Sequence, residues 1–237
     1  MLKTLSQTFL SLIFPVSCEL CAALLPAGGV QGVCRNCQSA ITLIPSPWCA
    51  GCGRHASQDG ERCGHCKDEK FHFDRAYACV YYDENMKKLL HAFKFERRRF
   101  LLPFFTDLMQ SFLERSLPQS SWDLVVPVPM DGPHELERGF SQARLLSAAL
   151  VKKSGIPHAP RALGCKAGVL QSSLRKPQRK RNAERRFFVK NTAGILSSRV
   201  LLVDDILTTG QTASACAKAL KKAGAKTVTV LALARGI

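Results

Sequence analysis

Residues 200–212, with the sequence VLLVDDILTTGQT, constrain the fold of this chain more than any other segment. The four apolar residues 200–203 predict a strand buried on both faces, as in a parallel sheet. Two aspartates follow at the carboxyl end of this strand, where open α/β sheets hold their ligands. The loop TTGQT then opens a helix predicted over residues 213–223 and ended by Gly224. The segment therefore predicts an α/β fold with a ligand site at one edge of its sheet.

The loop of this segment has the properties of a phosphate site. A helix N-terminus offers unpaired N–H groups and the positive end of a dipole, and glycine lets the backbone approach an anion closely. The carboxylates repel phosphate, so we expect them to meet sugar hydroxyls, or a metal ion through water. A buried strand with two helix-cap residues is the simpler alternative, but it needs neither the second carboxylate nor the glycine. The candidate ribose-phosphate residues are Asp204, Asp205, Thr208, Thr209, Gly210, Gln211 and Thr212.

Segment 200–212 resembles the ribose-phosphate motif of type I phosphoribosyltransferases over its full length. The resemblance implies that Asp204 and Asp205 contact the 2′ and 3′ hydroxyls of phosphoribosyl pyrophosphate (PRPP), which binds with Mg²⁺. It also implies that residues 208–212 grip the 5′-phosphate. Thr208 stands where hypoxanthine-type transferases carry an aspartate that faces the base. Ordinary purine salvage is therefore disfavoured.

Eight of the eleven cysteines form four C-x2-C pairs, separated by 12, 11 and 10 residues. Each pair can close two thiolates on one tetrahedral metal, and two pairs complete a four-thiolate zinc site. We expect two structural zinc ions in consecutive sites, with an interleaved cross-brace as the alternative pairing. His55 and His65 could replace a ligand, but all eight cysteines are available. The expected ligands are Cys18, Cys21, Cys34 and Cys37 for one site, and Cys49, Cys52, Cys63 and Cys66 for the other.

Composition divides the chain into two predicted domains. Residues 1–70 carry the cysteine pairs and few large apolar side chains, so this part needs metal to fold. Residues 71–237 alternate helix and strand patterns, which is typical of a doubly wound, mainly parallel sheet. Residues 1–14 predict a short amphipathic helix rather than a signal peptide, and no apolar run reaches transmembrane length. We expect a cytoplasmic protein, free or peripheral to the inner membrane, with export as the less favoured alternative.

Basic residues are concentrated in the second predicted domain. The formal charge is +16 overall, with 6 Lys/Arg against 5 Asp/Glu in residues 1–70 and 28 against 13 in residues 71–237. Such an excess favours nucleic acid, pyrophosphate or an anionic membrane surface as partner. The dense like charge of run 175–186 predicts a mobile loop, which could hold a nucleic-acid backbone, with a solvated charge run as the alternative. The resemblance to type I phosphoribosyltransferases implies that this loop closes over pyrophosphate. Its basic residues are Arg175, Lys176, Arg179, Lys180, Arg181, Arg185 and Arg186.

Two further segments carry a narrower resemblance. The sequence VPVP at residues 126–129, followed by RGFSQ at residues 138–142, resembles the pattern of the ComF family, which usually has Asn at the position of Ser141. Residues 171–187 resemble the stretch before the final strand in the same family. The resemblance implies a zinc ribbon joined to a type I phosphoribosyltransferase-like domain. It also implies a role in natural transformation and use of external DNA, with other DNA-uptake proteins as partners.

Two functional hypotheses follow from these features. In the favoured one, the chain handles internalised single-stranded DNA, which follows a positive groove and stacks on aromatic side chains. In the other, a nitrogen base displaces pyrophosphate from C1 of PRPP, and Mg²⁺ and basic residues stabilise the leaving group. Arg138 and Gly139 lie in a predicted loop that can approach pyrophosphate, unless Arg138 is an ordinary surface residue. The aromatic candidates for stacking are Phe93, Phe95, Phe100, Phe187 and Phe188.

Overall fold

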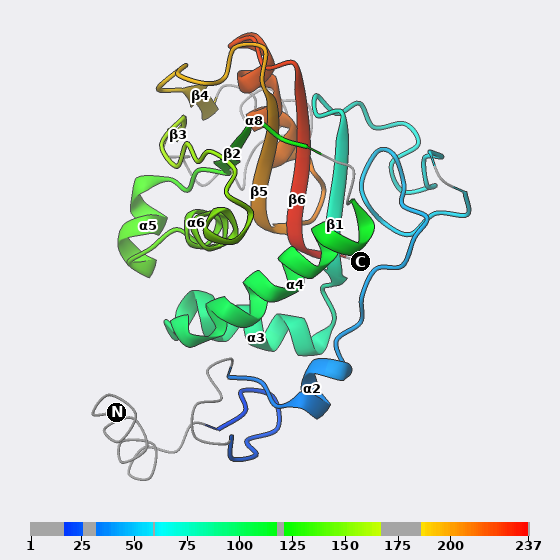
Figure 1. Cartoon of the computed structure of the whole chain (residues 1–237), viewed down its shortest axis with the longest axis vertical. Helices are drawn as coiled ribbons and strands as arrows, with labels where there is room; N and C mark the ends of the chain where they lie inside the picture. The colour runs from blue at the N-terminus through cyan, green and yellow to red at the C-terminus, as the bar shows by residue number, and fades with distance from the viewer. Residues whose placement is uncertain (1–16, 26–31, 59, 118–120, 167–185, 237) are drawn as a thin grey trace, which may run out of the picture.

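The computed structural model of the protein describes residues 17–25, 32–58, 60–117, 121–166 and 186–236. Its centre is a four-stranded parallel sheet in the spatial order β1-β6-β5-β2 (Figure 1). The strands are β1 (Arg75–Tyr81), β2 (Leu124–Pro127), β5 (Arg199–Leu207) and β6 (Thr227–Arg235). The predicted parallel α/β sheet is confirmed. The helix predicted at residues 1–14 lies outside the described residues.

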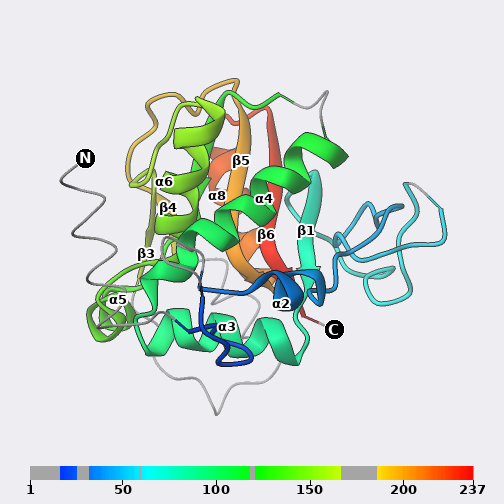
Figure 2. The same ribbon diagram turned by 60° about the horizontal axis from the view of Figure 1, so that its bottom comes forward.

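Helices cover both faces of this sheet (Figures 1 and 2). The helices α3 (Glu84–Phe95), α4 (Leu102–Ser116) and α6 (Gln142–Ser154) pack on one face, and α8 (Gln211–Lys222) packs on the other. Along β5, Leu201 and Val203 join the first core, whereas Val200 and Leu202 join the second. Side chains of a strand alternate between the faces of its sheet, so four consecutive apolar residues are what a doubly covered strand requires.

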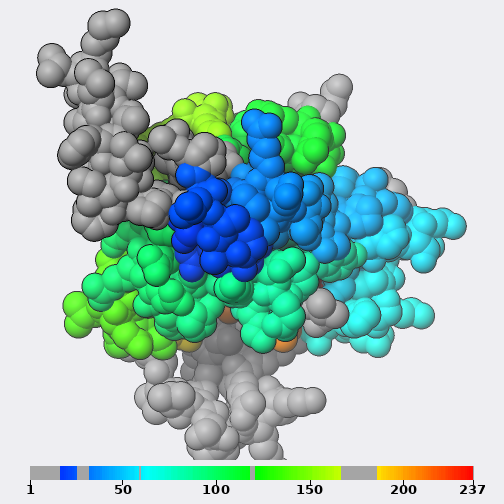
Figure 3. Space-filling view, turned by 90° about the horizontal axis from the view of Figure 1, so that it is seen from below, coloured from blue at the N-terminus to red at the C-terminus, as the bar shows by residue number. Residues whose placement is uncertain are grey.

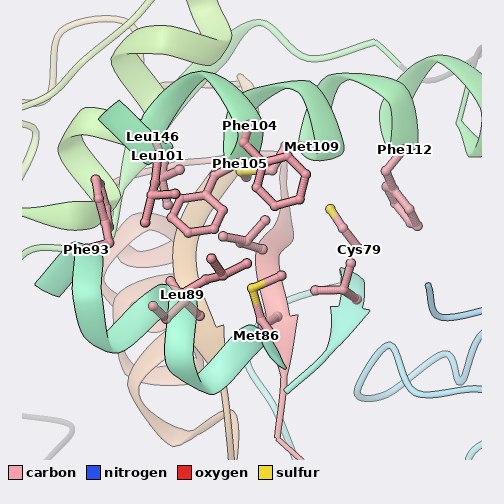
Figure 4. Close-up of a cluster of buried hydrophobic side chains, with 14 of the residues drawn as sticks. Cys79, Met86, Leu89, Phe93, Leu101, Phe104, Phe105, Met109, Phe112 and Leu146 are labelled. Atoms are coloured by element: carbon pink, nitrogen blue, oxygen red, sulfur yellow. The ribbon is translucent and has the colours of Figure 1, made fainter. Parts of the chain in front are cut away.

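Large side chains form the core between α3, α4 and the sheet (Figure 4). Phe93 of α3 packs edge-on against Phe105 of α4, with 5.3 Å between the ring centroids. Met86 and Leu89 lie in the same core and are fully buried. Each such side chain contributes about 1.5–3 kcal/mol by leaving water. This packing places the end of α3 beside the carboxyl end of β5.

Several elements differ from the sequence expectation. β5 continues through the two aspartates to Leu207 instead of ending before them. The loop expected to hold Arg138 contains a short helix, α5 (Gly132–Arg138), capped by the side chain of Asp131. The segment after α6 forms one bridge to the sheet, between Val125 and His158. The short strands β3 (Leu163–Cys165) and β4 (Phe187–Val189) form a separate antiparallel pair.

The cysteine-rich part forms two lobes. We call residues 17–25 and 32–41 the first ribbon, which includes α2 (Arg35–Ser39), and residues 46–58 and 60–69 the second ribbon. The first ribbon lies against α3, where Lys88 donates a hydrogen bond to the Leu20 carbonyl (Figure 3). The second ribbon lies beside β1, and a Cβ at Gly53 would come within 2.7 Å of the Ala76 carbonyl oxygen. Both lobes are therefore packed on the sheet domain.

Two smaller facts complete the fold. A 3-10 turn, η1 (Arg99–Leu101), leads from α3 into α4. None of the helices in the described ranges has the length and hydropathy that crossing a membrane requires.

Candidate functional site

The eight paired cysteines gather into two groups of four. In each group the four sulfur atoms lie within 4.8 Å of one another. The groups are Cys18, Cys21, Cys34 and Cys37 in the first ribbon, and Cys49, Cys52, Cys63 and Cys66 in the second. The ligands are therefore paired consecutively, and the interleaved cross-brace is excluded. His55 contacts the Pro45 carbonyl instead of a cysteine group.

The sulfur geometry fits zinc. Four thiolates at about 2.3 Å from a tetrahedral zinc ion are about 3.8 Å apart. The structure gives 3.3 Å between the sulfurs of Cys49 and Cys66, 3.5 Å between those of Cys52 and Cys63, and 3.7 Å between those of Cys21 and Cys34. These sites bind structural zinc, because four protein ligands leave no open coordination position.

Backbone N–H groups prepare the sulfurs for metal. Burial alone would raise the pKa of Cys49, but hydrogen bonds from the Cys63 N–H, the Cys66 thiol and the Gly51 N–H lower it to about 6. In the first ribbon, burial also opposes ionisation of Cys18. A hydrogen bond from the Cys34 N–H favours the thiolate, and the pKa of Cys18 is lowered to about 6. Zinc binds the thiolate form, so these contacts favour metal binding near neutral pH.

The acidic pair lies at the carboxyl end of β5, where the sequence predicted a ligand. The ammonium of Lys94, on α3, is 2.6 Å from a carboxylate oxygen of Asp205. Burial, and then the adjacent charge of Asp205, raise the pKa of Asp204 well above its usual range, although Lys94 partly offsets this. Asp205 is therefore paired with one cation, and the raised pKa favours the neutral form of Asp204. The sequence analysis missed Lys94, because only the packing of α3 brings it to β5.

The loop after the acidic pair turns at Gly210 into the N-terminus of α8. Gly210 has φ of +79°, and a Cβ there would lie 3.0 Å from the ring of Phe71. The Gln211 N–H donates to the Thr209 hydroxyl over 3.4 Å, and the Gln211 side chain donates to Glu69 over 3.1 Å. The side chains of Thr208, Thr209 and Thr212 are exposed to solvent. The loop is thus held on one side by the second ribbon and is open on the other.

A pocket of ≈ 330 Å³ lies between this loop and the second ribbon. Two arginines, a histidine and two loop threonines are among the residues that line it, so its wall is basic and polar. Its lining includes Arg54, His65, Glu69, Phe71, Thr208, Thr209, Gln211 and Arg235. The pocket thus reaches from the loop to the second ribbon. The sequence did not predict that the ribbon lies beside this loop.

Arg235 connects the second ribbon to the loop. Its side chain is 2 % exposed, at the end of the otherwise apolar strand β6. The guanidinium donates to the Cys52 carbonyl over 3.0 Å, and also to the carbonyls of Leu207 and Thr208. Such a planar group with several donors can hold separate backbone segments together. The sequence analysis missed this residue, although a single arginine that ends an apolar strand is a signal for a buried polar contact.

Arg138 and Gly139 lie at the end of α5, which differs from the expected open loop. The Arg138 guanidinium lies 5.0 Å from the ring centroid of Phe95 and donates to Gln142. Gly139 ends α5 in the left-handed conformation, with φ of +77°. Both residues border the end of α3 that carries Lys94.

Of the seven candidates in the basic run, Arg186 alone lies within the described residues. It pairs with Asp131, the residue that caps α5. Burial acts to raise the pKa of Asp131, but hydrogen bonds from the side chain and N–H of His134, together with the Arg186 charge, lower it overall. Arg186 therefore contacts the segment that carries Arg138.

Comparisons with known proteins agree with this architecture. A double zinc ribbon domain matches residues 9–67, and a phosphoribosyl transferase domain matches residues 135–237. The chain therefore combines a double zinc ribbon with a phosphoribosyltransferase-type domain. It belongs to the ComF family.

Three relatives illustrate the family. The DNA utilization protein YhgH of Salmonella typhimurium is 30% identical over 94% of this chain and 99% of its own length. Competence protein F of Haemophilus influenzae is 28% identical over 86% of this chain and 91% of its own. Competence protein ComFC of Bacillus subtilis is 29% identical over 82% of this chain and 80% of its own. The resemblance to the ComF family is thereby confirmed.

Proposed function

We propose that this chain binds PRPP, or a related ribose 5-phosphate, with Mg²⁺ at the carboxyl end of β5. One observation carries the proposal. The acidic pair lies on the central strand β5, and a turn at Gly210 leads from that strand into the N-terminus of α8, in a region that matches phosphoribosyl transferases. The N–H groups and hydroxyls of residues 208–212 bind the 5′-phosphate. Asp204 and Asp205 accept hydrogen bonds from the ribose hydroxyls.

Calorimetry tests this pocket. PRPP should bind in the presence of Mg²⁺, and Asp204→Ala or Asp205→Ala should remove detectable binding. Asp123→Ala is a suitable control, because Asp123 pairs with Arg199 just before β2, away from the loop. Unchanged affinity in both pocket variants would refute the assignment.

The biological role that we propose for this pocket is the handling of internalised single-stranded DNA. Relatives along nearly the whole chain are named as competence and DNA utilization proteins, and the formal charge of +16 suits a polyanion. Binding to a single strand should weaken steeply with salt, because each phosphate contact releases counterions. Neutralising Arg179, Lys180 and Arg181 together should reduce this salt dependence, whereas salt-insensitive or absent binding would contradict the role.

A phosphoribosyltransferase reaction is the second candidate, and the domain match favours it. Its acceptor would be a nitrogen base that attacks C1 of PRPP as pyrophosphate leaves. Pyrophosphate release from PRPP, measured with a panel of bases and with or without single-stranded DNA, separates the two roles. Release that depends on a base favours the enzyme, and the absence of release favours a binding role.

A further inference from the structure

The five phenylalanines that neighbour basic residues differ in how much of each is exposed to solvent. Phe93 is fully buried, and Phe187 is 8% exposed. Phe100 is half-buried beneath Gly32, where a Cβ would come within 2.4 Å of its ring. Phe188 is 38% exposed, on the face of the sheet that α8 covers. Phe95, at 54%, is the most exposed aromatic side chain among the described residues.

Phe95 has the neighbours of a stacking site. The Arg138 guanidinium lies 5.0 Å from its ring centroid, and the ring of His91 lies 4.9 Å away at a tilt of 42°. Arginine planes and aromatic rings are the groups on which proteins stack unpaired bases. The cluster of Phe95, His91 and Arg138 therefore offers π surface from two helices, α3 and α5, with half of the Phe95 side chain left open.

Three arginines lie close to this cluster in the chain. Arg97, Arg98 and Arg99 come after Glu96, the residue that follows Phe95 and lies 3.6 Å from His91, and all three are exposed. Arg97 and Arg99 both lie beside Gly139, the residue after Arg138. Arg98 pairs with Glu96 over 3.6 Å, whereas no described carboxylate forms an ion pair with Arg97 or Arg99. Arg99 donates to the Gly139 carbonyl and lies 4.6 Å from the ring centroid of Phe140, so the surface offers two arginines without a described carboxylate partner next to an exposed aromatic ring, as a single nucleic-acid strand requires.

The cluster also borders the acidic pair. Lys94 precedes Phe95 in the chain and reaches Asp205 on β5. A base stacked on Phe95 would therefore lie next to the sugar-phosphate end of the pocket. The phosphates on either side of that base would meet Arg97 and Arg99.

We infer that Phe95, backed by Arg138, is a base-stacking site for single-stranded DNA at the rim of the PRPP pocket. The inference rests on the proposed function, since it names the residue by which that role would be carried out. Its partner is an unpaired DNA strand, recognised by one base face and the flanking phosphates. It requires no sequence preference, because every base has a π face.

The test compares two strands of equal length and charge, a 20-nucleotide oligothymidylate and the corresponding abasic strand. In wild-type protein the thymidylate should bind more tightly by about tenfold, the low end of what one base–aromatic stack contributes. Phe95→Ala should weaken thymidylate binding by that factor, leave the abasic strand unchanged and keep the salt dependence. Phe95→Trp should restore the preference. Fluorescence anisotropy measures the affinity of each of the three proteins for each of the two strands.

Two controls separate this inference from the proposed function. Phe188→Ala removes another exposed ring on the opposite face and should leave both affinities unchanged. PRPP binding to Phe95→Ala should equal that of wild type, which shows an intact fold and pocket. Salt-dependent DNA binding that Phe95→Ala does not alter, or alters equally for both strands, would overturn the stacking site alone. Absence of DNA binding by wild-type protein would overturn both the stacking site and the proposed role in handling single-stranded DNA.

Discussion

The second ribbon lies beside β1 and packs its cysteines in a small cluster of their own, whereas the first ribbon lies on α3 and contributes Cys18, Val33 and Ile41 to the main core. In the second, Cys49, Cys52 and Cys66 are at most 3% exposed. In the first, Cys18 is equally buried but Cys21 is exposed. Two sites with the same ligands therefore differ in how they meet the rest of the chain.

The difference lies in what each ribbon supports. The second ribbon bonds directly to the candidate phosphate loop, through Arg235 and through Glu69 with Gln211. The first ribbon contacts α3, the helix whose Lys94 reaches Asp205. One ribbon thus bonds directly to the candidate phosphate loop, and the other supports α3, which brings Lys94 to the acidic pair.

The largest effect should come from breaking the second zinc site. Cys49→Ser should lower the zinc content from two ions per chain to one and weaken PRPP binding by about 100-fold, because a loop displaced by about 1 Å loses its geometry. Metal analysis and calorimetry on the same sample give both values. Retained affinity with one zinc lost would show that the ribbon does not hold the loop.

Removing Arg235 should have the next largest effect. Arg235→Met leaves the carbonyls of Cys52, Leu207 and Thr208 without this donor, at a cost of about 3 kcal/mol in the free energy of unfolding. PRPP binding should fall while both zinc ions remain. Arg199→Met is the matched control, because its ion pair with Asp123 is exposed to solvent and screened by water, so its loss should affect stability much less. Equal effects of the two substitutions in urea unfolding would contradict the bridging role.

Breaking the first zinc site should affect PRPP less. Cys21→Ser should also lower the zinc content to one, but PRPP affinity should fall only about threefold, a change of about 0.7 kcal/mol. The reason is that α3 remains held by its own buried face, which includes Met86, Leu89 and Phe93. If Cys21→Ser weakened PRPP binding as much as Cys49→Ser does, the two ribbons would not differ in their effect on the pocket, which would contradict this prediction.

The smallest effect concerns pH. The ionised carboxylate of Asp204 is the stronger acceptor, and burial and Asp205 raise its pKa, so PRPP affinity should increase as pH rises through that pKa. The Lys94 charge favours the ionised form, hence Lys94→Met should move this rise to higher pH. Lys87→Met, on the exposed side of α3, is the control. Calorimetry gives the PRPP affinity of each variant as a function of pH. The effect is disproved if the pH profile of Lys94→Met coincides with that of Lys87→Met.

The sequence predicted the parts of the site that lie within one segment. The alternation around β5 and the motif at residues 204–212 are local, and so are the cysteine pairs. The spacing of the cysteine pairs allows both consecutive and interleaved pairing, and only the sulfur positions show that the pairing is consecutive. The function of the individual loop residues remains a prediction.

Contacts between distant segments could not be predicted in the same way. Lys94 and Asp205 are brought together by the packing of α3, and Arg235 meets Cys52 across the junction of ribbon and sheet. α5 was missed because a helix of seven residues has little periodicity, although Asp131 and the proline at its first turn mark its start.

The position of β6 between β1 and β5 also governs the order in which the molecule can assemble. Residue Ala76 pairs with Val230, so one edge of β1 stays unpaired until a strand about 150 residues further along the chain has reached it, whereas the bridge of Leu43 to Val80 on the other edge is closer in sequence. Pairing over such a separation is slow, and an unpaired strand edge invites association with other chains while it waits. Because Arg235 belongs to that same late strand, the candidate phosphate loop is completed in the step that closes the sheet. A folding intermediate with filled zinc sites but without β6 would therefore be metal-loaded and yet unable to bind the ligand.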